Sequence, residues 1–471
     1  MSKDHKNNIS RRKFLGQSCA ALGYTTMFSS LINLKAIASA TMNNSFVLQN
    51  SGNYKALVCI SLTGGNDSYN MLMPRGNTEY NEYAITRSNL ALPQQDILQI
   101  NPFTTDGREF GIHPSMADMQ TIFENQDLAF ICNVGTLVEP ATKQEIYNQS
   151  VQTPLGLFSH SDQQQQWHTG RPHERSSIGW GGRIADLTQS MNSNDNISMN
   201  ISLQGLNLFQ RGLDIIPYTI SPSGSMKING YGENDGFNQL RTAALDAMMD
   251  RDYQDIFKNT YINTIKASSD ASNEFQDAID AVQPFNTQLP AGNGLAAQMQ
   301  MVAKTIMARD TLGFSRQIFY VQLGGWDHHD ELLFNHASNL SAVNEAMKYF
   351  YDLLQELNLF DQVTTFNISD FSRTLTSNGN GTDHAWGGNT FVMGGSVLGR
   401  EMYGAYPTLA LNSELDLFDG VLIPTMAADL YMAELALWFG VPHSDLSTIF
   451  PNLSNFFDTG SNTPPVGFMN I

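Results

Sequence analysis

The stretch that decides the fold is residues 56–67, Ala-Leu-Val-Cys-Ile-Ser-Leu-Thr-Gly-Gly-Asn-Asp. Residues 56–62 form a nearly continuous apolar run rather than an alternating one, which predicts a strand buried on both faces of a parallel sheet. Glycine and polar residues follow it directly. In open α/β sheets, ligand-binding groups collect at the carboxyl ends of the strands, so this stretch predicts both a central strand and a site at its end.

Similar runs recur along the chain and alternate with helical patterns. Strands are predicted at residues 128–134, 199–203, 317–323, 363–368 and 390–393. Helices are predicted at 114–124, 296–312 and 337–357, and an amphipathic helix at 426–439. This alternation predicts an α/β fold with a doubly wound, mostly parallel sheet and helices on both faces.

We expect this α/β domain to occupy residues 55–458, after a flexible lead-in at 41–54 and before a C-terminal tail at 459–471. The residue composition changes at 205–293, where Gly- and Ser-rich loops precede predicted helical segments at 240–264 and 267–281. Pro284 and Pro290 end this segment. We interpret 205–293 as a helical insertion or cap beside the crevice.

Residues 1–40 have the pattern of an export signal. Ser10-Arg11-Arg12-Lys13-Phe14-Leu15 resembles the twin-arginine motif, a modestly apolar stretch follows, and Ala38-Ser39-Ala40 offers a cleavage site. A membrane anchor and a lipoprotein at Cys19 are the alternatives, but the stretch is too polar for the first and its flanks fit the second poorly. The signal predicts handling by the twin-arginine export machinery, a periplasmic or secreted location, and no stable membrane insertion after cleavage.

The composition narrows the range of possible functions. The 471 residues include 45 acidic and 26 basic side chains, for a formal net charge of −19. Such an acidic surface repels a phosphate backbone, so nucleic-acid binding is not expected. The mature chain keeps Cys59 and Cys132, both in apolar strand runs, where cysteine usually serves as a small buried hydrophobe.

Carboxylates and imidazoles follow three of the predicted strands. They are Asp67 after the first, Asp327 and His329 in Gly-Gly-Trp-Asp-His-His-Asp-Glu (324–331), and Asp370 with His384 after the strand at 363–368. These five residues form an oxygen and nitrogen ligand set suited to one or two divalent metal ions, zinc, manganese or magnesium. Structural alternatives remain for each: Asp67 as a turn residue, 327–331 as a solvated loop, and Asp370 as a helix cap partnered by Arg373.

Other residues are candidates for the reaction itself. Ser159 and Ser161, at the start of a predicted helix, are candidate nucleophiles, although serine there is also a normal helix cap. A metal-activated water is the other candidate attacking group. Arg373 and Arg171 are expected to stabilise charge on a reacting anion. Asn66, His328 and Asp383 are expected to contact substrate.

Seven longer segments carry a family resemblance: LVCISLTGGNDSYNMLMP, SHSDQQQQWHTG, GWGGRIAD, GGWDHH, FNISDFSRT, GTDHAWGGNTFVMGG and LWFGVPHSDLSTIFPNL. Together they resemble the bacterial family called domain of unknown function 1501, over roughly residues 55–458, whose members typically carry a twin-arginine signal. That family is similar to the alkaline phosphatase and sulfatase superfamily. The resemblance implies an alkaline phosphatase-like sheet and metal-assisted ester hydrolysis.

The resemblance also implies roles for single residues. Asp67 matches the metal aspartate after the first strand, Asp327 and His329 match an Asp-then-His pair, here two apart instead of four, and Asp370 and His384 match later ligands. Phe371 stands where the superfamily has a histidine. The superfamily's nucleophile position falls on His160, between Ser159 and Ser161. Formylglycine sulfatases are excluded because their C/S-x-P-x-R sequence is missing.

The sequence therefore predicts an exported, metal-dependent hydrolase that acts on a small anionic ester of phosphate, or of sulfate or phosphonate. The alternative is a non-catalytic envelope protein for binding or assembly, which retains the fold with a degenerate metal site.

Overall fold

The computed structural model describes residues 54–471, so the predicted export signal and residues 41–53 of the lead-in lie outside the described residues. Tyr54, assigned to the lead-in from sequence, is buried, and its hydroxyl donates to Gln317 Oε1 at 2.6 Å. The packed domain therefore includes Tyr54.

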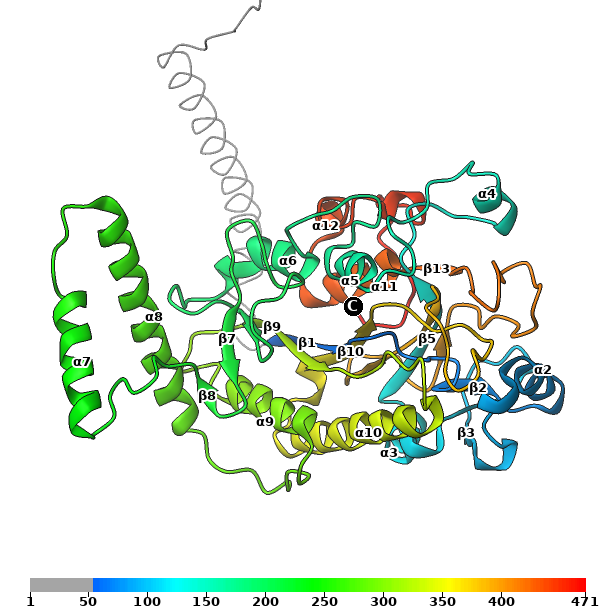
Figure 1. The fold of residues 1–471 in the computed structure, drawn as a ribbon, viewed down its shortest axis with the longest axis horizontal. Coiled ribbons are helices and arrows are strands. Elements are labelled where there is room, and N and C mark those ends of the chain that lie inside the picture. Colours follow the sequence, from blue (N-terminus) through cyan, green and yellow to red (C-terminus); the bar gives the residue numbers. More distant parts are fainter. Residues whose placement is uncertain (1–53) are drawn as a thin grey trace, which may run out of the picture. The chain divides into compact units, whose positions relative to one another are not determined.

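A ten-stranded sheet forms the centre of the domain, in the order β12-β5-β11-β10-β1-β9-β6-β7-β8, with β13 also paired to β5 (Figure 1). Its strands are β1 (Lys55–Leu62), β5 (Leu128–Gly135), β6 (Asn200–Ser202), β7 (Tyr218–Ser221), β8 (Gly224–Ser225), β9 (Arg316–Leu323), β10 (Val363–Ser369), β11 (Gly388–Met393), β12 (Met402–Tyr403) and β13 (Met426–Ala427). Central β1 pairs in parallel with both β9 and β10. Only β11 and β8 pair antiparallel with their neighbours among the described strands of this sheet, which confirms a mostly parallel sheet.

Helices cover both faces of the sheet (Figure 1). One face carries α5 (His160–Thr169), α6 (Trp180–Thr188), α11 (Ala428–Phe439) and α12 (Leu446–Ile449); the other carries α3 (Ala117–Glu124), α9 (Gly294–Met307) and α10 (Leu332–Glu356). The short helix α4 (Lys143–Tyr147) lies in the loop before α5. The doubly wound architecture predicted from the alternation is confirmed.

A second, three-stranded antiparallel sheet was not predicted. It consists of β2 (Leu72–Pro74), β4 (Phe110–Ile112) and β3 (Leu98–Ile100), in that order, and α2 (Asn77–Arg87) lies between β2 and β3 in the chain. Strands of three residues are too short to show a periodic pattern, which explains why the sequence did not reveal them.

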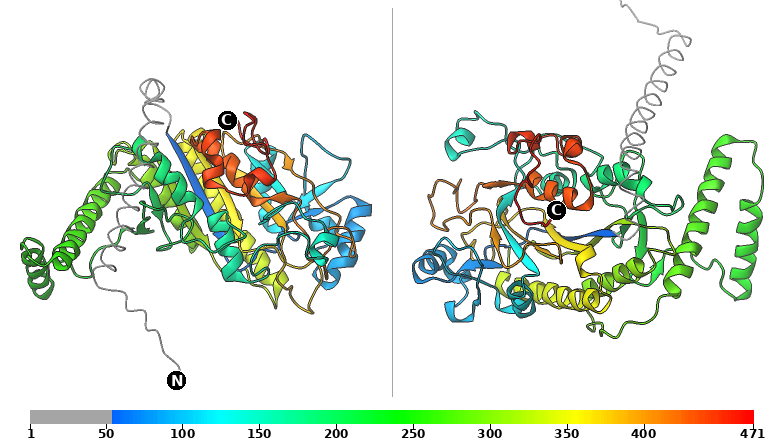
Figure 2. Two further views of the ribbon diagram at one scale, coloured as in Figure 1. Left: turned by 90° about the horizontal axis from the view of Figure 1, so that it is seen from above. Right: turned by 180° about the vertical axis from the view of Figure 1, so that it is seen from behind.

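Within 205–293, strands accompany the predicted helices, since β7 extends the main sheet beside β6. The helices are α7 (Gly236–Met249) and α8 (Ile256–Asp280), and they stand off the β7–β8 side of the sheet (Figures 1 and 2). The predicted break near residue 265 is wrong, because the break lies at 250–255. Asp255 begins α8 by accepting a hydrogen bond from the Lys258 amide at 3.0 Å, an N-cap whose signal was overlooked.

The C-terminal part is more buried than predicted. Residues 426–427 form β13, and α11 is buried on nearly all sides, so the prediction of an amphipathic helix is wrong. Residues 459–471 pack against the domain: the Glu434 carboxylate accepts from the amides of Val466, Gly467 and Met469 at 2.6–2.7 Å. The end of the chain is thus tied to α11.

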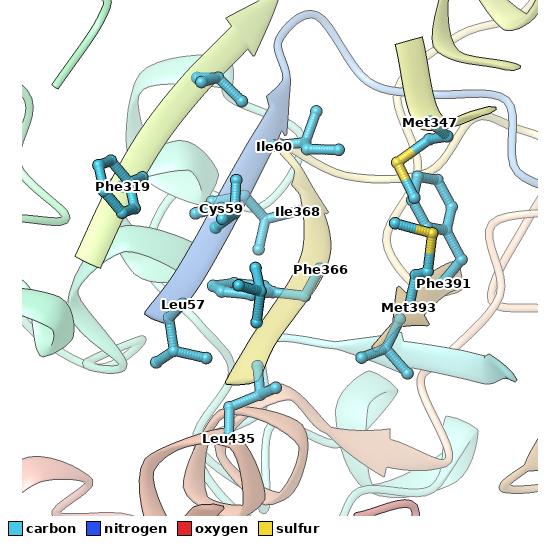
Figure 3. Close-up of a cluster of buried hydrophobic side chains, with 14 of the residues drawn as sticks. Leu57, Cys59, Ile60, Phe319, Met347, Phe366, Ile368, Phe391, Met393 and Leu435 are labelled. Atoms are coloured by element: carbon cyan, nitrogen blue, oxygen red, sulfur yellow. The ribbon is translucent and has the colours of Figure 1, made fainter. Parts of the chain in front are cut away.

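The core lies where β1, β9 and β10 meet the helices (Figure 3). Figure 3 labels Leu57, Cys59, Ile60, Phe319, Met347, Phe366, Ile368, Phe391, Met393 and Leu435. Cys59 and Cys132 are both buried and free, as expected, and burial raises the pKa of the Cys132 thiol to about 12. Across the described residues, no helix combines the length and apolarity that crossing a bilayer requires.

Candidate metal centre

Three neighbouring strands bring the candidate residues to one edge of the sheet. Leu62 at the end of β1 lies in register with Leu323 at the end of β9 and with Ser369 at the end of β10. Asp327 and His329 follow β9, and Asp370 follows β10. His384 precedes β11, and His160 begins α5.

Three imidazoles surround the Asp327 carboxylate. The Nε2 atom of His329 lies 3.1 Å from Asp327 Oδ1, and that of His384 lies 3.3 Å from the same oxygen. His160 Nε2 lies 3.4 Å from Asp327 Oδ2. The Nε2 atoms of His329 and His384 are 2.9 Å apart. We call these four residues, His160, His329, His384 and Asp327, the His₃Asp cluster.

The opposite ring nitrogen of each histidine has a partner of its own. His160 Nδ1 lies 2.9 Å from Asp370 Oδ2, and His329 Nδ1 lies 3.1 Å from Asp383 Oδ1. His384 Nδ1 lies 2.7 Å from the Phe158 carbonyl oxygen, which only accepts, so this nitrogen carries the proton. The carboxylates of Asp370 and Asp383 accept from the Nδ1 atoms of His160 and His329 in the same way. The proton of each ring is then on Nδ1, and the lone pair of each Nε2 is directed at Asp327.

This arrangement fits a divalent cation. Two Nε2 lone pairs facing each other at 2.9 Å repel unless a positive charge lies between them. Ligands about 2.1 Å from a tetrahedral zinc ion are roughly 3.4 Å from one another, and the three separations from Asp327 and the one between His329 and His384, 2.9–3.4 Å, are close to this value. His160, Asp327 and His384 each offer a ligand atom within 4.8 Å of the others, and His329, which is not part of that group of three, adjoins it through Asp327 and His384. Three imidazoles and one carboxylate suit zinc or manganese.

The local electrostatics favour the ligand forms of Asp327 and His384. Burial raises the pKa of Asp327, but the hydrogen bond and charge of Arg373 outweigh burial and bring that pKa below its ordinary value. Burial lowers the pKa of His384, so its imidazole is neutral at neutral pH. Burial also raises the pKa of Asp370, an effect that the hydrogen bond from His160 partly offsets.

Arg373 lies behind the cluster, away from solvent. Its side chain is fully buried; Nη1 donates to Asp327 Oδ1 at 2.6 Å, Nε donates to Thr382 Oγ1 at 3.3 Å, and Nη2 donates to the Thr382 carbonyl. The expectation that Arg373 contacts a reacting anion therefore needs correction, because its donors orient Asp327 and the loop that carries His384.

Asp67 does not face the cluster either. Its carboxylate is fully buried in an ion pair with Arg87, from the end of α2. The turn at Gly64 and Gly65, with φ of +119° and +88°, carries the chain past the sheet edge before Asp67 is reached. The structure thus gives Asp67 a different partner from the predicted metal ion.

Some of the residues expected to contact or stabilise the substrate reach the His₃Asp cluster, and others do not. Asn66 is buried with Oδ1 3.0 Å from His336 Nε2, and His328 is buried as well. Arg171 is ion-paired to Glu174 beyond the C-terminal end of α5, about 15 Å along the helix from His160. Asp383 reaches the cluster, but through the His329 ring.

Ser159 and Ser161 flank His160 and lie close to each other, with their hydroxyl oxygens 3.1 Å apart. Within the described residues, neither hydroxyl has a hydrogen bond to the four residues of the His₃Asp cluster. The residue between them, His160, is the one that reaches the cluster. Sequence reasoning placed His160 at the nucleophile position and missed it as a ligand, although its place at a helix start beside two other His-bearing segments was a usable signal.

Phe371 and Phe158 complete the surroundings. The buried Phe371 ring contacts the His160 and His384 rings, with centroids 4.7 and 4.6 Å away. Phe158 has φ of +72°, an unusual value for a bulky residue, and its carbonyl holds His384. Strained backbone of this kind collects at functional sites.

Comparison with solved structures finds sulfatases among the similar chains. The PsFucS1 sulfatase from Pseudoalteromonas sp. is 10% identical with a TM-score of 0.36, covering 87% of this chain and 72% of its own. Ps i-CgsB in complex with k-i-k-neocarrahexaose is 10% identical with a TM-score of 0.36, covering 85% and 77%. A Bacteroides thetaiotaomicron chain, BT33494S-sulf, is 9% identical with a TM-score of 0.34, covering 87% and 78%.

No curated protein matches the sequence. The family model described as "Protein of unknown function (DUF1501)" matches residues 54–444, which include all four residues of the His₃Asp cluster. The chain therefore belongs to the DUF1501 family.

Proposed function

We propose that this protein is a hydrolase that uses one divalent metal ion, held by the His₃Asp cluster, to cleave an ester of phosphate, sulfate or phosphonate. The observation that carries the proposal is the convergence of three Nε2 atoms on one carboxylate while each Nδ1 is held from outside. Such a donor arrangement costs electrostatic energy unless it serves a cation.

When bound, an ion of this kind polarises an ester oxygen and lowers the pKa of water towards neutrality. The chain's own residues supply the fixed geometry that this chemistry needs. Asp370, Asp383 and the Phe158 carbonyl hold the three imidazole rings, and Arg373 holds Asp327.

Water is our proposed attacking group. Support comes from the serine hydroxyls, which hydrogen bond to each other instead of to the cluster. Water attack at phosphorus or sulfur breaks the ester bond and releases the alcohol and the acid, with no covalent enzyme intermediate. Ser159 and Ser161 remain the alternative nucleophiles, and their separate replacement by alanine distinguishes the two routes.

One ion is proposed instead of two. Asp67, a candidate ligand for a second ion, is paired with Arg87, and the Phe371 ring, at the position where the superfamily has a histidine, packs against the His160 and His384 rings. Export through the twin-arginine pathway is part of the proposal and rests on residues 10–15 and 38–40 of the sequence.

The test is hydrolysis of 4-nitrophenyl phosphate, bis(4-nitrophenyl) phosphate and 4-nitrophenyl sulfate by exported protein loaded with zinc or manganese. We expect activity that a chelator removes and that Asp327→Asn lowers at least about 100-fold, since removing a ligand disrupts the centre. Asp252→Asn, an exposed residue between α7 and α8, is the matched control. Folded, metal-loaded protein that cleaves none of the three esters would contradict the proposal.

The second candidate is a binding or assembly protein of the envelope. The α7–α8 pair favours it, because α7 has no buried residue, and Phe237, Leu240 and Phe257 are 70–83% exposed. Exposed apolar groups of this size often mark interaction surfaces. Under this alternative, Phe237→Ser with Leu240→Ser abolishes partner capture, while Asp327→Asn leaves it intact.

A further inference from the structure

Among the described residues, the His₃Asp cluster has no free lysine or arginine to meet a negatively charged substrate. Among the hydrogen bonds and ion pairs of the His₃Asp cluster in the described part of the chain, the only lysine or arginine is Arg373. That side chain is fully buried, and Nη1, Nε and Nη2 all donate to Asp327 or Thr382. A substrate oxygen has no access to it.

The rim of the site is acidic. The Asp327 and Asp383 side chains are 45% and 60% exposed, and the exposed residues Asp330 and Glu331 directly follow His329. Two segments approach here, residues 324–336, which are the loop after β9 and the first turn of α10, and residues 374–389, which lead into β11, and neither contains a lysine or arginine. Hydrogen bonds join the loops, since Asn378 Nδ2 donates to the His329 carbonyl at 3.2 Å and Asn380 Nδ2 donates to Asp330 Oδ1.

One exposed arginine lies near the start of α5, but it is already paired. Arg175 Nη2 lies 2.9 Å from Asp162 Oδ1, two residues after His160. This pair adds no net charge to the surroundings of the cluster.

With a divalent ion bound, the formal charges within the centre would balance. The two positive charges of the ion and the one of Arg373 would equal the three formal negative charges of the Asp327, Asp370 and Asp383 carboxylates. Outside them, Asp330 and Glu331 add negative potential at the rim. A reacting group with two negative charges meets net repulsion here, whereas one with a single charge is repelled about half as strongly.

We propose that the site selects esters whose reacting group carries one negative charge, a phosphodiester or a sulfate ester, over doubly charged phosphate monoesters. This inference rests on the proposed function and specifies its substrate class. In either case the oxygen of water bonds to phosphorus or sulfur, the bond to the leaving oxygen breaks, and one proton of the water ends on the released alcohol.

The experiment compares kcat/KM for bis(4-nitrophenyl) phosphate, 4-nitrophenyl sulfate and 4-nitrophenyl phosphate at pH 8, with metal-loaded full-length protein. The first substrate is a phosphodiester and the second a sulfate ester, so together they show which of the two singly charged groups the site accepts. We expect at least one of them to exceed the monoester by about tenfold or more. A monoester preference in active enzyme overturns this inference alone, whereas no hydrolysis by metal-loaded protein overturns the proposed function.

Comparing a charge-reversed variant with the wild type removes the effect of intrinsic substrate reactivity. That reactivity contributes equally to the ratio of kcat/KM values between substrates in both proteins, so a change in the ratio reports the rim charge. Asp330→Lys with Glu331→Lys changes the rim by four charges and should shift that ratio towards the monoester by about tenfold at low salt, less at high salt. Asp330→Asn with Glu331→Gln should give about half that shift on a logarithmic scale.

Asp252→Lys, at an exposed position between α7 and α8, is the control and should leave the ratio unchanged. Thermal unfolding of each variant establishes that it is folded. A ratio that stays within about twofold of the wild type in the folded lysine variant, at low salt, overturns the inference.

Discussion

Asp383 illustrates how a single residue acts on the centre through another side chain. Its carboxylate lies 3.1 Å from His329 Nδ1 and also accepts from Asn378 Nδ2 at 3.2 Å. A carboxylate in this position fixes the ring orientation and makes the opposite nitrogen a stronger ligand. Under the proposed function, Asp383 therefore supports the metal site through the His329 ring without facing the ion.

Asp383→Asn should weaken zinc binding about 10- to 100-fold, because outer carboxylates of metal-binding histidines have effects of this size. Competition with a coloured zinc chelator measures the change. Asp330→Asn is the matched control, since Asp330 lies on the adjoining loop but has no contact with an imidazole among the described residues. Unchanged zinc affinity in Asp383→Asn would contradict the assigned role.

At this scale the sequence predicts that Asp327, His329, Asp370 and His384 lie together, because each lies near a predicted strand, and the structure does bring them together with His160. It also proposed Asp67, which the structure pairs with Arg87. That pairing depends on how α2 packs against the loop after β1, and no local sequence pattern reveals such a contact. The sequence places His160 at the expected nucleophile position, whereas in the structure its imidazole lies beside Asp327.

Among the elements, the loop after β9 and the loop before β11 must approach closely for the cluster to form. A Cβ atom on Gly381 would lie 2.3 Å from the His329 carbonyl carbon and 2.5 Å from the His328 carbonyl oxygen. Only glycine allows this contact, because both obstructing groups are backbone.

Gly381→Ala should therefore separate the loops that carry His329 and His384 and lower zinc affinity at least about tenfold. Gly324→Ala is the matched control in the loop after β9, since a Cβ there would meet only Thr63 Oγ1, at 3.6 Å. Isothermal titration of both variants with zinc checks this. Equal affinity of the two variants would show that loop contact does not set the geometry.

Strands and helices of ordinary length were predictable, as β1, β5, β9, β10 and α10 show. Errors arose where tertiary contacts decide the outcome. The α11 sequence fits an amphipathic helix, but burial of Glu434 by the C-terminal residues makes nearly every face of it internal. The strands β2, β3 and β4 are stabilised by one another and leave no local pattern.

On the scale of the whole molecule, two buried histidines away from the cluster make stability depend on pH. Burial lowers the pKa of His113 to about 4 and that of His168 to about 4. His113 Nδ1 also accepts a hydrogen bond from the Ser115 amide at 3.0 Å, which requires an unprotonated nitrogen. Both side chains are therefore neutral in the folded protein at neutral pH.

The unfolded chain binds more protons than the folded one between pH 6.5 and 4, because these histidines have an ordinary pKa near 6.5 once exposed. The free energy of unfolding should fall as pH falls through this window, by up to about 3 kcal/mol per histidine. His168→Gln should flatten the dependence. Urea unfolding with chelator present, at pH 7 and pH 4.5, measures it, and equal slopes in both proteins would contradict the assignment.

The overall architecture followed from the alternation of strands and helices, but its details did not. Sequence gives the order of strands along the chain, not their order in the sheet, so the antiparallel β11 between β10 and β5 was not predicted. The same holds for β7, which places part of 205–293 in the main sheet. The role of this segment as a cap stays a prediction.

The central claim is that His160, His329, His384 and Asp327 hold one divalent ion. Its most direct test is elemental mass spectrometry of the exported protein, purified without chelator or nickel affinity resin, beside His384→Ala. The account predicts about one equivalent of zinc or manganese per chain, and less than about a tenth in the folded variant. Folded wild-type protein with less than about a tenth of an equivalent, or a variant that keeps its full metal content, would contradict it.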